Sequence, residues 1–281
     1  MKKITRRSFM AAAGLTVAAL ALTACGGSSS TASSAAASSV ASSAAASSEA
    51  ASAAADVTTV EAGKLTMATN ATFPPYEMTT DNGTIEGIDV DTAQAIADKL
   101  GLELQIDDMD FDAALLSVQQ GKADIAMAGV TVTDERKAVM DFSDSYATGI
   151  QSIIVPEGSD ITSPDDLAGK KIGTQRGTTG YIYCSDDFGD DAVVAYDDGL
   201  TAVQALNNGQ VDAVVIDNAP AKEFVAANPG LVILDTSYAE EDYAIGLAKG
   251  SALEDAVNAA LEELKADGTL QSIVDKYITA E

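Results

Sequence analysis

Two charged side chains of opposite sign stand at equivalent places in two similar stretches of the chain. The stretches "SVQQGKADIAMAG" (117–129) and "ALNNGQVDAVVID" (205–217) each read as a helix end, a glycine, an aspartate and an apolar strand. Thr131 and Arg136 follow the first strand, and Asp217 ends the second. Ligands of open α/β sheets bind beyond the carboxyl ends of the strands. We therefore expect a guanidinium and a carboxylate to face each other across a cleft.

A cation and an anion on opposite walls suit a zwitterion such as an α-amino acid. Arg136 is the natural partner of the α-carboxylate, because its planar fork donates two parallel hydrogen bonds. Asp217 would then bind the α-ammonium group. Two structural alternatives stay open. Arg136 could form a surface salt bridge with Asp134 or Glu135, and Asp217 could cap the helix that starts in "NAPAKEFVAANPG".

The elements that must position these side chains alternate between strands and helices. Such alternation is typical of mostly parallel sheets covered by helices. The pattern restarts after about residue 150, which together with the repeated stretch indicates two similarly built α/β lobes. Alternatively, the repeated stretch could be the same type of helix-to-strand loop occurring twice, without two related lobes. Strands are predicted at 64–69, 102–106, 123–128, 150–155, 170–175, 192–196 and 211–216, and helices at 88–101, 112–121, 178–184, 200–209 and 251–268, the last with a capping box from Ser251 to Glu254.

The N-terminus predicts export and a lipid anchor. Residues 1–24 combine a basic start with an Ala-rich apolar run, the layout of a signal peptide. The run is shorter than a good membrane-spanning helix. "TRRSF" resembles a twin-arginine signal, so either export route is open. "LTAC" resembles the bacterial lipobox, in which Cys25 is lipidated; the alternative is an ordinary cleavage site that precedes a cysteine. Residues 25–60 would then form a flexible Ser/Ala-rich tether that follows the lipid.

Composition excludes several classes of function. The chain has 43 Asp and Glu against 16 Lys and Arg, a net charge of −27. This argues against nucleic acid and against direct docking on anionic lipid. It contains no histidine, which removes Ser-His-Asp and Cys-His catalysis and the usual catalytic zinc sites. Once Cys25 carries lipid, Cys184 has no disulfide partner within the chain. No metal, no cofactor and no catalytic residue is predicted.

Over residues 61–281 the sequence resembles the family-3 extracellular solute-binding proteins, the amino-acid receptors of bacterial ABC importers. The segment "GIDVDTAQAIADKLG" (87–101) is similar to the family's signature and departs from it at Thr92, where an aliphatic residue is usual. Four further blocks follow the family's order. They are "TNATFPPYE", "DFDAALLSVQQGKADIAMAGVTVTDERKAVMDFSDSY", "IGTQRGTTG" and "GQVDAVVIDNAPA".

The resemblance implies an α/β type II periplasmic-binding-protein fold, with two lobes joined by two hinge strands and a ligand cleft between them. Lobe 1 would comprise residues 61–149 and 239–281, and lobe 2 residues 150–238. The resemblance assigns Arg136 to the carboxylate, Asp217 to the ammonium, and Phe73 and Phe111 to aromatic walls around the side chain. It further implies that Gly129, through its backbone, and Thr131, through its hydroxyl, assist Arg136 in binding the carboxylate, and that Thr178 and Thr179 supply the second lobe's contribution.

The class of the ligand's side chain is predicted from positions that correspond to the family's ligand pocket and carry unusual residues in this sequence. Asn70 stands where many members carry an aspartate, and Gln175 and Ile216 are also neutral. A charged side chain in a dry pocket needs a partner charge. The neutral set therefore favours an uncharged polar amino acid such as glutamine. Arg176 is the one charge nearby, and its direction stays open.

These inferences predict an extracytoplasmic lipoprotein on the outer face of the cytoplasmic membrane. It would be a monomer that passes an amino acid to the permease subunits of an ABC importer and touches the membrane through its lipid alone. Two alternatives are a ligand-sensing module for a membrane receptor and a surface dehydratase or hydrolase on the same scaffold. For the enzyme, "DDMDFD" and "SDDFGDD" could supply paired carboxylates, although solvated loops explain them better.

Overall fold

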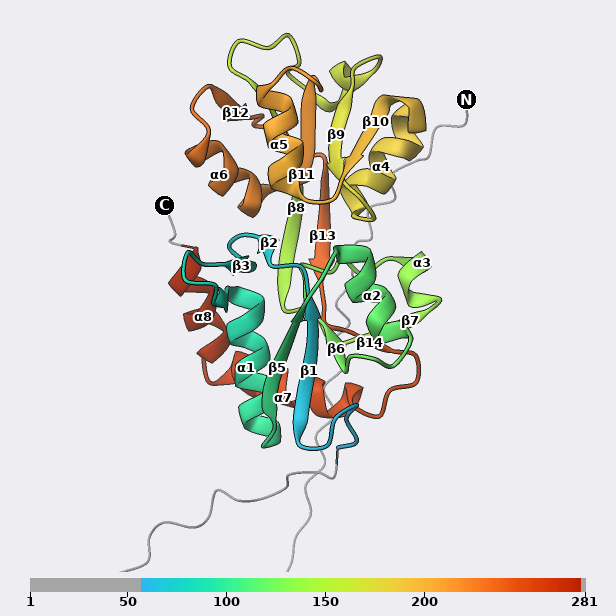
Figure 1. The fold of residues 1–281 in the computed structure, drawn as a ribbon, viewed down its shortest axis with the longest axis vertical. Coiled ribbons are helices and arrows are strands. Elements are labelled where there is room, and N and C mark those ends of the chain that lie inside the picture. Colours follow the sequence, from blue (N-terminus) through green and yellow to red (C-terminus); the bar gives the residue numbers. More distant parts are fainter. Residues whose placement is uncertain (1–56, 279–281) are drawn as a thin grey trace, which may run out of the picture. The chain divides into compact units, whose positions relative to one another are not determined.

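The computed structural model describes residues 57–278 (Figure 1). The predicted signal peptide, Cys25 and most of the tether lie outside the described residues. Among residues 57–278, no helix is long and apolar enough to cross a membrane.

The first lobe is built around a sheet with the strand order β5-β1-β6-β14-β7. Strands β5, β1 and β6 are parallel, whereas β14 runs antiparallel to both β6 and β7. A small antiparallel sheet, β2-β3-β4, follows β1 along the chain. The strands are β1 (Lys64–Thr69), β2 (Thr72–Phe73), β3 (Glu77–Thr79), β4 (Ile85–Glu86), β5 (Glu103–Asp108), β6 (Ile125–Ala126), β7 (Met140–Phe142) and β14 (Gly246–Ala248).

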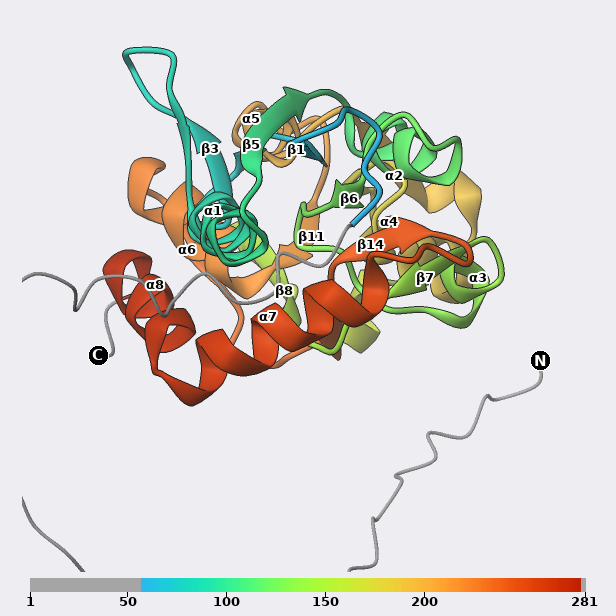
Figure 2. The same ribbon diagram turned by 90° about the horizontal axis from the view of Figure 1, so that it is seen from below.

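Helices cover both faces of this sheet. The first-lobe helices are α1 (Ile88–Leu100), α2 (Phe111–Gln119), α3 (Asp134–Lys137), α7 (Glu254–Ala266) and α8 (Thr269–Tyr277). Viewed from below, α1 and α7 lie on one side of the strands and α2 lies on the other (Figure 2). Leu65 and Met67 pack in the cluster of α1 and α7, whereas the adjacent Ala68 packs with α2. This alternation is the period of two that a strand imposes on its side chains.

The second lobe has a mixed sheet with the order β10-β9-β11-β8-β12, and β13 also pairs with β8. Its strands are β8 (Ala147–Pro156), β9 (Ile172–Gln175), β10 (Val193–Tyr196), β11 (Ala213–Asp217), β12 (Leu231–Ile233) and β13 (Ala239–Tyr243). Its helices are α4 (Thr179–Phe188), α5 (Gly199–Asn207) and α6 (Asn218–Ala227), with the 3-10 turns Pro164–Leu167 and Asp190–Ala192. The predicted alternating α/β architecture is confirmed, with two mixed sheets.

Strands β8 and β13 connect the two lobes, which belong to one compact unit of the chain (Figure 1). They pair antiparallel from Ala147↔Tyr243 to Gln151↔Ala239. The chain enters β8 directly after the first-lobe strand β7 and leaves β13 directly before β14. The paired strands therefore lie where one lobe would turn against the other.

The predicted capping box of the last long helix is wrong. Helix α7 begins at Glu254, with Leu253 rather than Ser251 at the N-cap position. The Ser251 hydroxyl accepts from the amide of Leu253 at 3.2 Å, which is too early in the chain to cap the first helical turn. The expected apolar face is present nevertheless, because Leu253, Val257, Leu261 and Leu264 are all buried.

Candidate functional site

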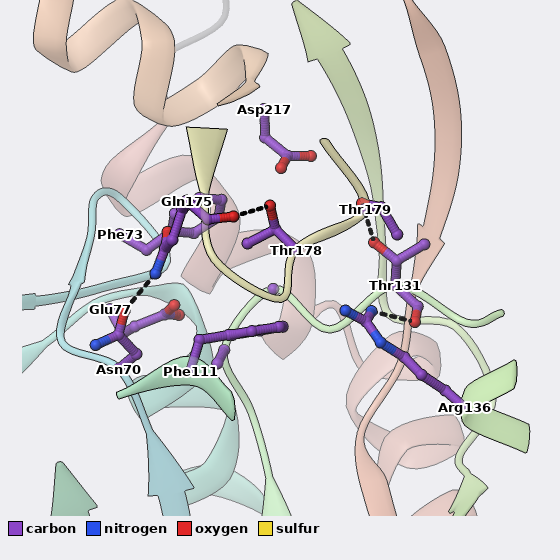
Figure 3. A pocket seen from close by; sticks show the side chains of 12 residues that line it. Asn70, Phe73, Glu77, Phe111, Thr131, Arg136, Gln175, Thr178, Thr179 and Asp217 are labelled. Atoms are coloured by element: carbon purple, nitrogen blue, oxygen red, sulfur yellow. Dashed lines mark hydrogen bonds between the residues drawn. The ribbon is translucent and has the colours of Figure 1, made fainter. Parts of the chain in front are cut away.

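The structure gathers all the predicted ligand-binding side chains around one cavity between the lobes (Figure 3). They come from loops and element ends rather than from the middle of strands, as expected for an α/β site. The first lobe contributes Asn70, Phe73, Phe111, Gly129, Thr131 and Arg136, and the second lobe contributes Gln175, Thr178, Thr179 and Asp217. Glu77 and Ala128 also line the cavity and were not predicted.

Arg136 lies inside the cavity wall and not on the surface. Its side chain belongs to the short helix α3, and the residue is only 8 % exposed. The guanidinium donates to the carbonyl oxygens of Thr131 at 2.8 Å and Gly177 at 3.1 Å, and it lies 5.3 Å from the centre of the Phe111 ring. The predicted alternative, a surface salt bridge within α3, does not describe this geometry. Burial lowers the pKa of Arg136, and the nearby negative charge of Glu241 opposes that shift most strongly.

Asp217 ends β11 and stands at the N-cap position of α6, but its side chain makes no capping hydrogen bond. One carboxylate oxygen accepts from Nε2 of Gln151 at 2.9 Å, and the other accepts from the hydroxyl of Tyr243. Gly149 leaves the space for this arrangement, since a Cβ there would lie 2.5 Å from the Tyr243 ring and 2.8 Å from the carboxylate. Burial raises the pKa of Asp217 to about 7. The carboxyl group is thus buried and fixed in place by hydrogen bonds from two side chains.

Hydrogen bonds join the two walls of the cavity. Gln175 Nε2 donates to Asn70 Oδ1 at 2.9 Å. The hydroxyls of Thr131 and Thr179 lie 3.4 Å apart, and both donate to Glu241. The Arg136–Gly177 bond also crosses between the lobes. The cavity measures about 10 Å³, roughly the space that one water molecule needs. An amino acid can therefore enter only if the walls separate.

Arg176 points away from the cavity. Its side chain is 57 % exposed and lies 3.7 Å from Asp197 on the surface. The question that the sequence left open is thereby answered, and the second lobe's contribution to the cavity remains neutral except for Asp217.

Sequence reasoning missed Glu77. This residue is fully buried, and no N–H or O–H group of the described residues donates to its carboxylate oxygens. Its carboxyl group lies within hydrogen-bond reach of the buried carboxyl group of Asp89. Burial raises the pKa of Glu77 well above its ordinary value, and the negative charge of Asp89 adds to this. A signal was present, because Glu77 closes the block "TNATFPPYE" and pairs directly with Phe73 across β2 and β3. A short hairpin there would place the carboxylate beside the predicted aromatic wall.

Two residues behind the cavity wall were also missed. Gln151 of β8 and Glu241 of β13 are both buried. They hydrogen-bond to Thr131, Thr179 and Asp217, which line the cavity. Neither stands in a recognisable motif, so no sequence signal could have assigned them to the site.

The fold and the site define a two-lobed binding protein, and comparison with known proteins assigns its family. Residues 65–280 match the model of the bacterial extracellular solute-binding proteins, family 3. The chain belongs to this family. It is 33 % identical to a probable histidine-binding protein of Neisseria gonorrhoeae, over 96 % of this chain and 95 % of that protein. It is 34 % identical to the L-cystine-binding protein TcyJ of Escherichia coli, over 79 % and 85 % of the two chains.

Solved structures agree with the family. A mutant of the arginine-binding protein ArgBP from T. maritima is 40 % identical and superposes with a TM-score of 0.74, covering 78 % of this chain and 96 % of that one. An ancestral arginine-binding protein bound to glutamine is 42 % identical, also with a TM-score of 0.74, over 78 % and 99 % of the chains. The predicted periplasmic-binding fold is confirmed. The chain is an extracytoplasmic amino-acid-binding protein of an ABC transporter, and its family is not enzymatic.

Proposed function

We propose that this protein is a lipid-anchored receptor that captures one amino acid between its lobes and delivers it to an ABC importer. The observation that carries the proposal is the placement of Arg136 and Asp217. They come from different lobes, both are buried, and both line the same cavity. This pair supports binding of the two charges that every α-amino acid shares.

Each end of the ligand would replace contacts that the site now makes with itself. The α-carboxylate would accept from the Arg136 guanidinium, which now donates to two carbonyl oxygens. A charge-assisted bidentate pair is stronger than bonds to neutral carbonyls. The α-ammonium would donate to Asp217, whose carboxyl group is already oriented by Gln151 and Tyr243. Opening of the lobes would break the direct contacts, and closing on the ligand would restore a water-free site.

We further propose that the lobes comprise residues 61–149 with 239–281, and residues 150–238. Movement between them would take place in the paired strands β8 and β13, near residues 147–153 and 235–240. The position of the β8–β13 ladder supports this assignment, because the chain passes between the lobes from β7 into β8 and from β13 into β14. A receptor that signals to a membrane protein instead of feeding a permease would need the same motion, so only the partner distinguishes the two functions.

The class of side chain has two candidates. Asn70 and Gln175 are neutral and hydrogen-bond to each other, which supports an uncharged polar ligand. Glu77 supports a cationic one, and we favour it. An ionised carboxylate that is fully buried without a cation is costly, so Glu77, whose pKa is raised well above its ordinary value by burial, would ionise only when a cation arrives. Asp217 already matches the α-ammonium. A guanidinium or a second ammonium group on the ligand would supply the cation that Glu77 lacks. One similar structure is of an arginine-binding protein, and another was solved with glutamine bound. Proteins of this fold therefore bind both cationic and uncharged polar amino acids.

Calorimetric titration with L-arginine and L-citrulline tests the proposal. The two molecules have nearly the same shape, but only arginine is charged at the side-chain end. We expect arginine to bind at least about 30-fold more tightly, the lower end of the cost of leaving a buried charge unpaired. Glu77→Gln should remove most of this preference. Glu157→Gln, an exposed residue of the same type, should keep it.

Different results would reject the cationic ligand class or the receptor function. Tighter binding of citrulline or glutamine by the wild-type protein would establish the uncharged class and reject the role of Glu77. Failure of every amino acid to bind would reject the proposed function as a whole.

A further inference from the structure

Glu241 occupies an unusual position for an acidic residue. It lies in β13, one of the two strands that connect the lobes, and is 6 % exposed. Its neighbours Glu240 and Asp242, on the opposite face of the same strand, are exposed. The cavity wall separates Glu241 from the cavity, which it does not line. A buried carboxylate needs hydrogen-bond donors around it, and the donors found here belong to the binding site.

One carboxylate oxygen of Glu241 collects three hydrogen bonds. Thr131 Oγ1 of the first lobe donates at 3.2 Å, Thr179 Oγ1 of the second lobe donates at 3.0 Å, and Gln151 Nε2 of β8 donates at 3.0 Å. The other oxygen has no hydrogen-bond partner within 3.5 Å among the described residues, although Tyr183 lies close enough for Glu241 to raise the pKa of its hydroxyl. Glu241 therefore holds one cavity hydroxyl from each lobe against a connecting strand.

These bonds decide what the two hydroxyls can do toward a ligand. A threonine hydroxyl carries one hydrogen to donate and two lone pairs that accept. Because a carboxylate can only accept hydrogen bonds, the Thr131 and Thr179 hydroxyls each donate their single hydrogen to Glu241. Their oxygens then offer only lone pairs to the cavity. Lone pairs suit an ammonium group, which only donates, and do not suit a carboxylate.

Gln151 ties the same arrangement to Asp217. Its amide nitrogen has two hydrogens and lies within hydrogen-bond distance of both carboxylates, 2.9 Å from Asp217 and 3.0 Å from Glu241. The amide therefore presents its donor side to both acids. The acceptor groups at this end of the cavity, one carboxylate and two hydroxyl oxygens, thus belong to a single network.

We propose that Glu241 is a positioning residue, which turns the Thr131 and Thr179 hydroxyls into acceptors and so makes the site selective for a ligand with an α-ammonium group. The proposal rests on the proposed function, since it concerns the same cavity. Glu241 acts only by orienting the two hydroxyl groups and does not contact the ligand itself.

The test compares two probes that differ only at the α-position. L-Arginine carries the ammonium group, and 5-guanidinopentanoic acid is the same molecule without it; L-glutamine and glutaramic acid form the equivalent pair should glutamine bind more tightly. Glu241→Gln keeps the size of the side chain but can turn donor hydrogens toward the threonines. We expect the amino acid to bind about tenfold more weakly or worse. The des-amino acid should bind equally well or better, because a negative charge near its carboxylate is removed.

Glu240→Gln is the matched control, since it makes the same change of charge on the exposed face of the same strand. It should leave both affinities unchanged. Equal weakening of both probes by Glu241→Gln would show a merely structural role and overturn the proposal, as would affinities identical to those of the control. Binding of no probe by the wild-type protein would reject the proposed function instead.

Thr179→Val supplies an independent test in case Glu241→Gln does not fold, which a melting curve without ligand would show. Valine keeps the shape of threonine and removes the oxygen. The proposal requires the same selective loss for the amino acid, with the des-amino acid unaffected. Loss confined to the des-amino acid would mean that the hydroxyl donates to the carboxylate, and it would overturn the proposal.

Discussion

Gln175 and Asn70 meet across the cavity, with Nε2 of Gln175 2.9 Å from Oδ1 of Asn70. Gln175 ends β9 in the second lobe, and Asn70 follows β1 in the first. Asn70 in turn donates to the carbonyl oxygen of Met109 at 3.0 Å. A neutral amide pair thus spans the part of the cavity where the ligand's side chain is expected, and the buried carboxyl group of Glu77 lines the same cavity.

Asn70→Asp should shift the ranking of ligands toward cations. An aspartate still accepts from Gln175 but adds a negative charge next to Glu77, so a cationic side chain would gain a second charged partner. Hydrogen bonds to charged groups exceed neutral ones by roughly 1 kcal/mol, and we expect the arginine-to-citrulline preference to rise about five- to tenfold. Calorimetry on both ligands measures this ratio. An unchanged ratio would place Asn70 outside the side-chain subsite.

Arg136→Ala and Asp217→Ala should abolish detectable binding of every amino acid. Each removes one partner of a desolvated charge pair, which typically costs about 2–5 kcal/mol, or roughly 30- to 5,000-fold in affinity. A ligand at 100 times its dissociation constant raises the stability of the wild-type fold by about 2.7 kcal/mol, and thermal melting would show the loss of this shift. Near-normal binding by Arg136→Ala would refute the site assignment.

Binding should weaken as the pH falls below about 7. Burial raises the pKa of Asp217 to about 7 in the free protein, so its carboxyl group binds a proton below that pH. An α-ammonium ligand binds the ionised form and must displace this proton. The apparent affinity should therefore drop by up to about tenfold per pH unit below 7, with proton release on binding.

Calorimetry in buffers of different ionisation heat measures that proton directly. The Glu77→Gln variant removes the contribution of Glu77, whose pKa burial also raises. Burial raises the pKa of Asp89 to about 6 as well, so the loss of affinity between pH 7 and pH 6 is the part assigned to Asp217. A pH-independent affinity between pH 5 and 8 in this variant would show that Asp217 is ionised before the ligand arrives.

Ligand should make the particle more compact. A cavity of about 10 Å³ cannot admit an amino acid unless the lobes part, and the interlobe bonds at Asn70 and Arg136 must break and re-form. Because the ligand-free lobes must open to admit a ligand that then bridges them, small-angle scattering with saturating ligand should give a smaller radius of gyration than the open, ligand-free protein. Equal radii, with binding confirmed by calorimetry, would contradict hinge closure in β8 and β13.

Cys25→Ser should release the protein from membranes. The cysteine lies outside the described residues, and the prediction rests on the lipobox-like "LTAC". Detergent phase partitioning of the wild-type protein and the variant would show the change. A wild-type protein that already partitions into the aqueous phase would rule out the lipid anchor.

The sequence alone was sufficient to predict that Arg136 and Asp217 meet at one cavity. Arg136 and Asp217 each follow an apolar strand in a repeated αβ pattern, and in α/β folds the ends of such strands converge at the ligand edge. Hydrophobic period and strand-helix alternation therefore predicted both the lobes and the two residues. The family-like blocks placed Asn70, Gln175 and the threonines at the same cavity, and the structure brings all of them together.

Only the tertiary structure decided which other polar residues belong to the site. Glu77, Gln151 and Glu241 lie on strands, where the side chain's direction depends on which partner strand lies alongside and in what register. Glu240, Glu241 and Asp242 are three acids in a row, yet pairing of β13 with β8 buries only the middle one. Burial then determines their chemistry, because a carboxylate removed from water must find donors or a cation. That requirement arises from long-range packing, which no local pattern in the chain records.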